Sequence, residues 1–178
     1  MNEKIYGYDK TATPLDGVNP VNEIKFGVCV DGRKKDDDPK TIVTTVVKDA
    51  ESLNISFDNG IEEWNPMDQA GWVRRLMTSK SLSVSMGGKR NYGDVGNDYV
   101  AKVAYENGQK CNSWFSIIFP NLDQLIIPCV ISVTSGGGDS TGVEALEWEV
   151  QSDGKPTYIT YTASETMAAG VSADKLSK

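Results

Sequence analysis

The sequence contains no histidine among its 178 residues. Histidine is the most common general base and the most common zinc ligand in proteins, so its absence excludes a Ser-His-Asp triad and a histidine-based zinc centre. The three cysteines, Cys29, Cys111 and Cys129, are too few and too widely spaced to indicate a disulfide framework. Each lies in an apolar stretch, so we expect buried free thiols.

Long hydrophobic stretches and an excess of basic residues are also missing. No stretch approaches the ~20 apolar residues of a membrane helix, and the N-terminal MNEKIYGYDK lacks the apolar core of a signal peptide. We therefore expect no membrane partner and a chain that is made and folded in the cytoplasm. The 18 Lys and Arg are outnumbered by 25 Asp and Glu, for a net charge of −7. This balance argues against a surface that grips nucleic-acid phosphates, because such surfaces cluster Lys and Arg.

Motifs for nucleotide, metal and acid–base chemistry are incomplete. The glycine-rich stretch 136–141 has Thr141 where a dinucleotide fingerprint needs its third glycine. The acidic run 36–38 lacks the alternate spacing and the glycine of an EF-hand loop. Glu62 and Glu63 are neighbours in an expected strand, where they point to opposite faces and make a poor catalytic pair. The sequence predicts no catalytic centre, no cofactor and no metal site.

Polar and apolar residues alternate in many stretches of the sequence. This pattern is typical of strands with one buried face and one solvent-exposed face. In the stretch 71–90, two strand-like segments are joined by a polar corner at Ser79-Lys80, and Gly87-Gly88 is expected to end the second one. The apolar face of that second segment is Leu82, Val84 and Met86, and its polar face is Ser81, Ser83 and Ser85. Further strands are expected within 23–30, 41–47, 53–57, 110–119, 125–133, 143–150 and 157–162, and 58–60 (Asp-Asn-Gly) is expected to be a turn.

One short helix is expected after Gly93, with Asp94 or Asn97 as its N-cap and Gly108 as its terminator. About eight strands, one helix and no alternation of strands with helices favour a mainly β fold, a β-sandwich or partly closed barrel with one packed α-helix. The length suits a single domain over residues 1–178. We expect an extended N-terminal arm over about 1–20 and a flexible C-terminal tail over about 163–178.

The segment 31–40 (DGRKKDDDPK) is divided into a basic half and an acidic half. One interpretation is a solvated loop. The other is a contact loop whose halves meet the opposite halves of identical copies. Because the segment connects the expected strands 23–30 and 41–47, we predict that these form an extended β-hairpin protruding from the body.

Four stretches stand out together: WNPMDQAGWVRRLMTSKSLSVS from Trp64, GKRNYGDVGNDYVAKVAY from Gly88, FPNLDQLIIPC from Phe119 and GGGDSTGVEALEWEVQSDGKPTY from Gly136. In combination they resemble the tail tube (major tail) proteins of long-tailed bacteriophages of Gram-positive hosts. The resemblance covers most of residues 60–160. It implies a β-sandwich with a flanking helix, six copies of which form a ring whose inner strands join into one continuous barrel. Stacked rings make the tube through which viral DNA leaves, inside a channel whose wall tends to be acidic.

From the same resemblance we expect a virion protein, assembled in the host cytoplasm, whose partners are its own copies and other tail proteins (tape measure, tail tip, terminator). Viral DNA passes through without specific binding, because an acidic wall repels it. Candidate channel-lining residues are Glu51, Asp58, Glu62 and Glu63, with the serine face 81–85 as an alternative. Candidate ring-stacking residues are Arg33, Lys34, Lys35, Asp36, Asp37 and Asp38. Candidates for contacts within a ring are Arg74, Arg75, Lys89 and Arg90, with plain surface solvation as the alternative.

Two other interpretations stay open at this point. The first is a carbohydrate- or receptor-binding β-sandwich of a phage or bacterial surface, with Trp64, Trp72, Trp114 and Trp148 as a sugar-stacking platform. The second is a tail terminator or the inner tube of a contractile device. A hydrolase is disfavoured by the lack of histidine and of a convergent acid pair.

Overall fold

The computed structural model describes residues 4–6 and 14–161. Nine strands and one α-helix lie within these ranges. The strands are β1 (Lys4–Tyr6), β2 (Lys25–Val28), β3 (Val43–Val46), β4 (Ala50–Trp64), β5 (Arg74–Lys89), β6 (Asn112–Ile118), β7 (Gln124–Gly137), β8 (Ala145–Ser152) and β9 (Thr157–Ile159). The helix is α1 (Val95–Val103), and short 3-10 turns occur at Val21–Glu23, Pro39–Thr41, Met67–Gln69 and Gly108–Cys111. No helix in this part of the chain has the length and apolar character needed to span a membrane.

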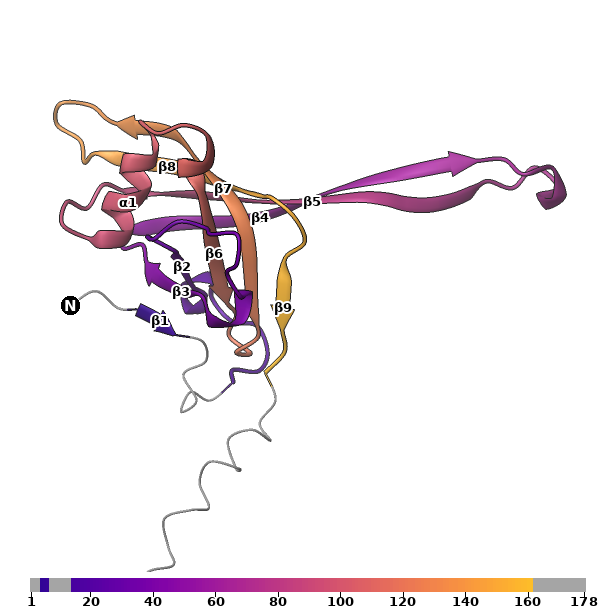
Figure 1. The fold of residues 1–178 in the computed structure, drawn as a ribbon, viewed down its shortest axis with the longest axis horizontal. Helices are drawn as coiled ribbons and strands as arrows, with labels where there is room; N and C mark the ends of the chain where they lie inside the picture. Colours follow the sequence, from indigo (N-terminus) through magenta and orange to yellow (C-terminus); the bar gives the residue numbers. More distant parts are fainter. Residues whose placement is uncertain (1–3, 7–13, 162–178) are drawn as a thin grey trace, which may run out of the picture.

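The strands form one antiparallel sheet in the order β1-β3-β2-β6-β7-β8-β5-β4, with β9 added to β7. Val28 of β2 and Val84 of β5 belong to the same core although their strands lie far apart in this order. The sheet therefore curls around its core without closing (Figure 1). This confirms the predicted mainly β fold with one packed helix.

The core is built from the alternating residues that the sequence indicated. Leu82, Val84 and Met86 are buried, and Phe115 meets Trp148 edge-on with ring centroids 5.8 Å apart. Helix α1 covers this core, and its amphipathic spacing buries one face of it. The core residues of α1 are Val100 and Val103.

All three cysteines are free thiols, as predicted. Cys29 and Cys129 are buried and Cys111 is half-buried. Burial raises the pKa of the Cys129 thiol to about 12, so this group stays protonated at neutral pH and is unreactive.

Helix α1 begins where the sequence predicted. The carboxylate of Asp94 accepts a hydrogen bond from the backbone N–H of Asn97 at 2.9 Å, which makes Asp94 the N-cap. The Asn97 amide donates to the carbonyls of Lys48, in the turn between β3 and β4, and of Lys89, at the end of β5, and so fixes the helix start to both. The helix stops at Val103, so Gly108 does not terminate it and instead opens the following 3-10 turn.

The predicted protruding hairpin exists, but the prediction placed it on the wrong segment. β2 and β3 do pair across residues 31–40, yet each is only four residues long and lies in the body. The hairpin that protrudes is β4–β5 (Figure 1). β5 runs straight through the predicted corner at Ser79-Lys80 and through Gly87-Gly88 to Lys89.

The predicted turn at 58–60 is also wrong, because these residues lie inside β4. Gly60 is opposite Ser79, and a Cβ on Gly60 would collide with the Ser79 hydroxyl. Gly60 therefore lies where the two strands approach each other closely, next to a register shift. It does not reverse the chain. The expected C-terminal tail lies outside the described residues, as does half of the expected N-terminal arm, residues 1–3 and 7–13. The described parts of that arm are β1, which pairs with β3, and residues 14–20.

Candidate assembly surfaces

The outer part of the β4–β5 hairpin, residues 58–80, projects from the body and is called the arm here (Figure 1). β8 pairs with β5 only from Ser83 to Lys89, so the arm part of β5 is paired on one side alone. Over its whole length β4 pairs only with β5 among the described strands. Unpaired N–H and C=O groups on strand edges are templates for pairing with another chain.

The arm exposes apolar side chains that a monomeric domain would bury. Met67 and Trp72 near its end are 103% and 78% exposed, and Ile61 and Leu76 are 54% and 59% exposed. The full exposed apolar set of the hairpin is Phe57, Ile61, Trp64, Met67, Trp72, Val73, Leu76 and Met77. So many exposed apolar side chains on one protruding element mark an interaction site.

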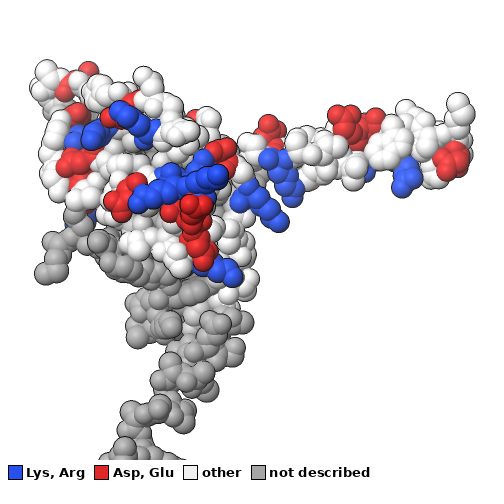
Figure 2. All heavy atoms as spheres, viewed as in Figure 1, with Lys and Arg blue, Asp and Glu red and all other residues white. Residues whose placement is uncertain are grey.

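Charges on the arm are mixed in sign. Figure 2 shows acidic and basic side chains spread along it with uncharged surface between them. Glu63 accepts a hydrogen bond from Arg75 at 2.6 Å across the two strands, and the Arg74 guanidinium lies 5.7 Å from the centroid of the Trp64 ring. These contacts engage Glu63, Arg74 and Arg75, whereas the other charged residues of the arm, Asp58, Glu62, Asp68 and Lys80, make no ion pair in the described chain.

The tip of the arm, residues 65–73, has a defined shape. Its 3-10 turn is closed by the N–H of Gln69 bonding to the Pro66 carbonyl at 3.2 Å, and the N–H of Trp72 bonds to the Gln69 carbonyl at 3.0 Å. Ala70 and Gly71 adopt left-handed backbone angles, with φ of 51° and 86°, that reverse the chain. The tip therefore presents Trp72 from a turn that its own backbone hydrogen bonds hold.

The sheet face opposite the core is polar and acidic where β4, β5 and β8 meet. Residues directly opposite on paired strands share a face: Ser81 is opposite Asp58, and Ser85 lies between Asn54 on β4 and Glu149 on β8. We call this the acid–serine face. Its members are Asn54, Ser56, Asp58, Ser81, Ser83, Ser85, Glu147, Glu149 and Gln151. It has three carboxylates. Ala145, two residues before Glu147, continues the face and is opposite Lys89, so one lysine lies at the end of this face, 3.5 Å from the Glu51 carboxylate.

The four predicted channel-lining acids divide between the two sides of the hairpin. Asp58 lies on the acid–serine face, and Glu62 continues that face along the arm. Glu63 lies on the other side, paired with Arg75. Glu51 sits at a register shift, where its carboxylate is 3.5 Å from Lys89 Nζ.

Glu147 and Glu149 belong to the acid–serine face, but they are not among the residues singled out from the sequence. The local signal was present, since burial of Trp148 and Val150 leaves these two glutamates on the opposite side of β8. Their alignment with the serines depends on the pairing of β8 with β5, which no local pattern reveals.

The charged segment 31–40 is folded onto the body. Asp37 accepts hydrogen bonds from the Lys34 backbone N–H at 2.7 Å and from the Trp114 indole at 2.9 Å, and these bonds hold the pKa of its carboxyl below the usual value. Arg33 is ion-paired with Asp153. Lys34, Lys35, Asp36 and Asp38 are exposed. That segment 31–40 contacts the next ring stays a prediction. Only these exposed side chains are available for such a contact.

The four bases assigned to contacts within a ring are separated by the structure. Arg74 and Arg75 lie on the arm, and Lys89 lies near Glu51 at its base. Arg90 is largely buried and bonds Asp98 at 2.6 Å and the side chain of Asn97 at 2.7 Å. Arg90 thus already has partners inside its own chain.

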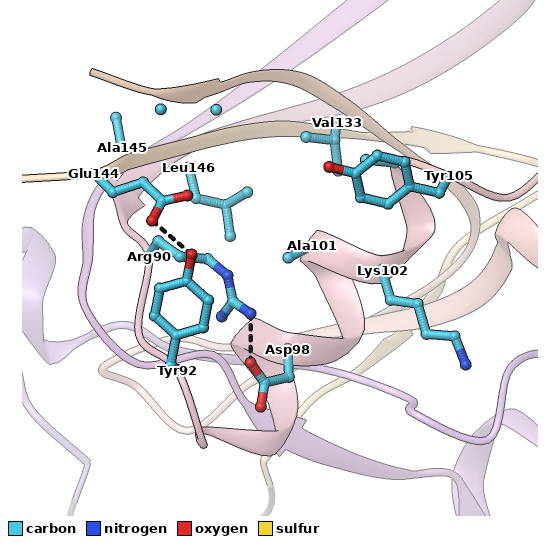
Figure 3. Close-up of a pocket in the computed structure, with 13 residues that line it drawn as sticks. Arg90, Tyr92, Asp98, Ala101, Lys102, Tyr105, Val133, Glu144, Ala145 and Leu146 are labelled. Carbon is cyan, nitrogen blue, oxygen red and sulfur yellow. Dashed lines mark hydrogen bonds and ion pairs between the residues drawn. The ribbon is translucent and has the colours of Figure 1, made fainter. Parts of the chain in front are cut away.

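A groove of about 720 Å³ lies between α1 and the hairpin formed by β7 and β8 (Figure 3). Ala101, Val133 and Leu146 line it with apolar side chains. Tyr92 and Tyr105 line it as well and are 71% and 89% exposed. The Tyr92 hydroxyl donates to Glu144 at 2.7 Å, which raises the pKa of Tyr92, and the Arg90 guanidinium stacks 4.2 Å from the Tyr92 ring centroid.

The described residues hold no group of three or more Cys, Asp or Glu that could bind a metal ion. The four tryptophans do not form one platform. Trp114 and Trp148 are buried in the body, whereas Trp64 and Trp72 are near the end of the arm. A sugar-stacking surface made of all four is therefore excluded.

The sequence matches no protein-family model and no curated protein sequence. Solved structures do match it in fold. A chain from the tail of an empty gene transfer agent particle with C6 symmetry is 17% identical with a TM-score of 0.60, and the match covers 80% of this chain and 100% of that one. A chain from the virion of a native gene transfer agent particle is 16% identical with the same TM-score and coverage. The protein thus has the fold of proteins found in phage-like tail particles.

Proposed function

We propose that this protein is the subunit of a phage tail tube. Six copies form a ring, rings stack into a tube, and viral DNA passes through its channel. The observation that carries the proposal is the position of an unpaired strand edge, β4, directly beside the acid–serine face. The fold shared with chains of gene transfer agent particles, one of them from a tail with C6 symmetry, supports it.

Ring closure uses the part of the β4 edge that lies within the body, residues 50–57. Pairing of this edge with a neighbouring copy extends the sheet across the subunit boundary. Six such contacts close the sheet into a barrel and leave no free edge along it. The acid–serine face then becomes continuous around the ring.

The acid–serine face lines the channel in this proposal. Asp58, Glu147 and Glu149 give each copy three negative charges toward the bore, and the serines keep that surface hydrated. DNA carries one negative charge per ~1.7 Å of helix axis, so a wall whose carboxylates outnumber its one lysine, Lys89, which is paired with Glu51, repels it. Such a wall lets DNA slide without sticking, whereas a basic wall would bind it. Glu51 and Glu63, which have basic partners, contribute less.

Stacking between rings is assigned to the arm. The arm reaches beyond the body by ~7 residues of β4, roughly 24 Å, and it carries the exposed apolar side chains. The segment 31–40 is held against Trp114 and Asp153 and protrudes less. We also propose that the protein is part of the virion of a long-tailed phage. Its further partners there are the tape measure, tail tip and terminator proteins.

Negative-stain microscopy of the purified, concentrated protein tests the proposal. Rings with six-fold symmetry, or tubes built from them, are expected. A matched variant replaces residues 58–81 by an Asn-Gly turn between Phe57 and Leu82, which are opposite each other. This variant is expected to form rings that do not stack. A protein that remains monomeric at every concentration, also when tail-tip complexes are added as nuclei, contradicts the proposal.

A further inference from the structure

We propose that the groove between α1 and the β7–β8 hairpin is the socket for the arm tip of a second copy of this chain. The inference rests on the proposed function, because it names the surface that receives the arm when rings stack. The segment that fills the groove is residues 65–73 of a neighbouring copy, with the side chains of Trp72 and Met67 inserted.

The groove is already shaped before anything binds. The Arg90 guanidinium is fixed by Asp98 and by the Asn97 side chain, and it supports the ring of Tyr92 from one side. The hydroxyl of Tyr92 is held by Glu144 (Figure 3). A preformed wall loses little conformational entropy on binding, which favours association.

The surface of the groove matches an apolar, aromatic insert. Ala101, Val133 and Leu146 offer apolar contacts, and Tyr105 stands almost fully exposed beside them. Exposed tyrosines around an apolar floor are typical of interface centres, since each combines a large contact area with a polar end. Trp72 is a side chain of the type that most often anchors such interfaces.

The tip and the groove also match in charge. The tip has one charged residue, Asp68, which makes no ion pair within the described chain and lies in the first turn of the tip's 3-10 helix. Lys102 lies at the groove and is likewise without an ion pair in residues 14–161. The other charged groups there, Arg90 with Asp98 and Glu144 with Tyr92, already have partners. The Asp68 carboxylate on the tip therefore meets the Lys102 ammonium at the groove, which has only a longer-range interaction with Glu106 among the charge contacts found in residues 14–161.

The tip cannot reach the groove of its own chain. In Figure 1 the arm points away from the body, on the side opposite to α1 and the β7–β8 loop. A protruding element and its socket on opposite sides of one molecule make a head-to-tail contact, and a contact of this kind repeats without closing on itself. It therefore generates a stack of copies from a single interface.

Two variants that each destroy one half of the contact test the inference. Ala101→Trp fills the groove, with Val95→Trp, on an exposed part of the same helix, as its control. The double substitution Met67→Ser and Trp72→Ser removes the insert, with Val18→Ser at a fully exposed position as its control. In analytical ultracentrifugation, each test variant alone is expected to sediment as a smaller species than the wild type. The controls are expected to sediment like the wild type.

An equimolar mixture of the two test variants supplies one intact tip and one intact groove. The mixture is expected to form a complex of about twice the mass of either variant alone. The charge pair gives a second test: Asp68→Lys and Lys102→Glu are each expected to weaken self-association at least tenfold, and the two together to restore it. The inference is overturned if the mixture behaves as the sum of its components, or if Ala101→Trp assembles like the wild type. If mixed complexes form but no six-fold rings are ever seen, the result supports the groove as the binding site of the arm tip and contradicts the proposed tail-tube function.

Discussion

The indole N–H of Trp114 donates a hydrogen bond to the carboxylate of Asp37 at 2.9 Å, and so connects a highly charged loop to the core of the sheet. The same carboxylate accepts from the backbone N–H of Lys34. Trp114 is only 6% exposed, whereas the Asp37 carboxylate lies near the surface. The bond explains why segment 31–40 belongs to the body and does not protrude.

We expect Asp37→Ala to lower the free energy of unfolding by about 0.5–1.5 kcal/mol, because it removes the hydrogen bonds from the Trp114 indole and the Lys34 backbone N–H. Asp36→Ala is the matched control. Asp36 is exposed and takes part in none of the side-chain hydrogen bonds found in residues 14–161, so its replacement is expected to change stability by less than about 0.5 kcal/mol. Urea unfolding of the two variants measures the difference. Equal effects at positions 36 and 37 would show that the loop is only solvated.

The acidity of the proposed channel wall predicts a gain of DNA binding on charge reversal. We expect tubes of the triple variant Asp58→Lys, Glu147→Lys and Glu149→Lys to retain DNA in co-sedimentation, with binding that falls steeply as salt rises. Phage carrying the variant should deliver less DNA. A control with the same change in charge places lysine at the exposed Asp16, Glu23 and Asp139. If the control tubes retain as much DNA as the triple variant, the acid–serine face is not the wall.

The one-sided pairing of the arm predicts a gradient of hydrogen exchange along β5. Amides of residues 83–89 lie between β4 and β8, whereas those of residues 74–80 pair with β4 alone. An isolated two-stranded ribbon is at best marginally stable in water, so the outer amides should exchange faster in the free protein. In assembled protein the outer half should become protected. Uniform protection of β5 in the free protein would contradict the proposed role of neighbouring copies.

Asp123 predicts a specific pH dependence of stability. Its pKa lies below the usual value chiefly because the Tyr158 hydroxyl donates to it, with further hydrogen bonds from the Tyr161 N–H and the Asn121 amide. A carboxyl whose pKa is lower in the folded state stabilises the fold above its unfolded pKa of about 3.9, and this contribution is lost as pH falls through the folded pKa. Tyr158→Phe should therefore be less stable than wild type above about pH 5, with a difference that shrinks below about pH 4. Chemical unfolding at a series of pH values measures this, and a difference that stays constant down to about pH 3 contradicts it.

The faces of the strands could be predicted from the sequence because burial on a strand has a period of two. Leu82, Val84 and Met86 form a buried row and the intervening serines do not, as the alternation indicated. The helix start was equally predictable, because Asp94 caps it by a local hydrogen bond. These features depend on residues close together in the chain.

The length of the β4–β5 hairpin could not be predicted in the same way. Asp58-Asn59-Gly60 has the composition of a turn, but its glycine lies opposite Ser79, 19 residues away, whose hydroxyl occupies the place of a Cβ. The real reversal uses Pro66, Ala70 and Gly71. Likewise, Glu147 and Glu149 join the acid–serine face only through their pairing with residues of β5 that lie 60 and 64 positions earlier in the chain. Long-range pairing decides both features.

A cryo-EM reconstruction of the assembled protein tests most directly whether copies complete one another's sheets around an acidic channel. We predict a six-fold ring in which the backbone of β4 is hydrogen-bonded to a strand of the adjacent copy, with Asp58, Glu147 and Glu149 facing the bore. Rings in which the β4 edge remains unpaired, or in which these three carboxylates point to the outside, would contradict the account.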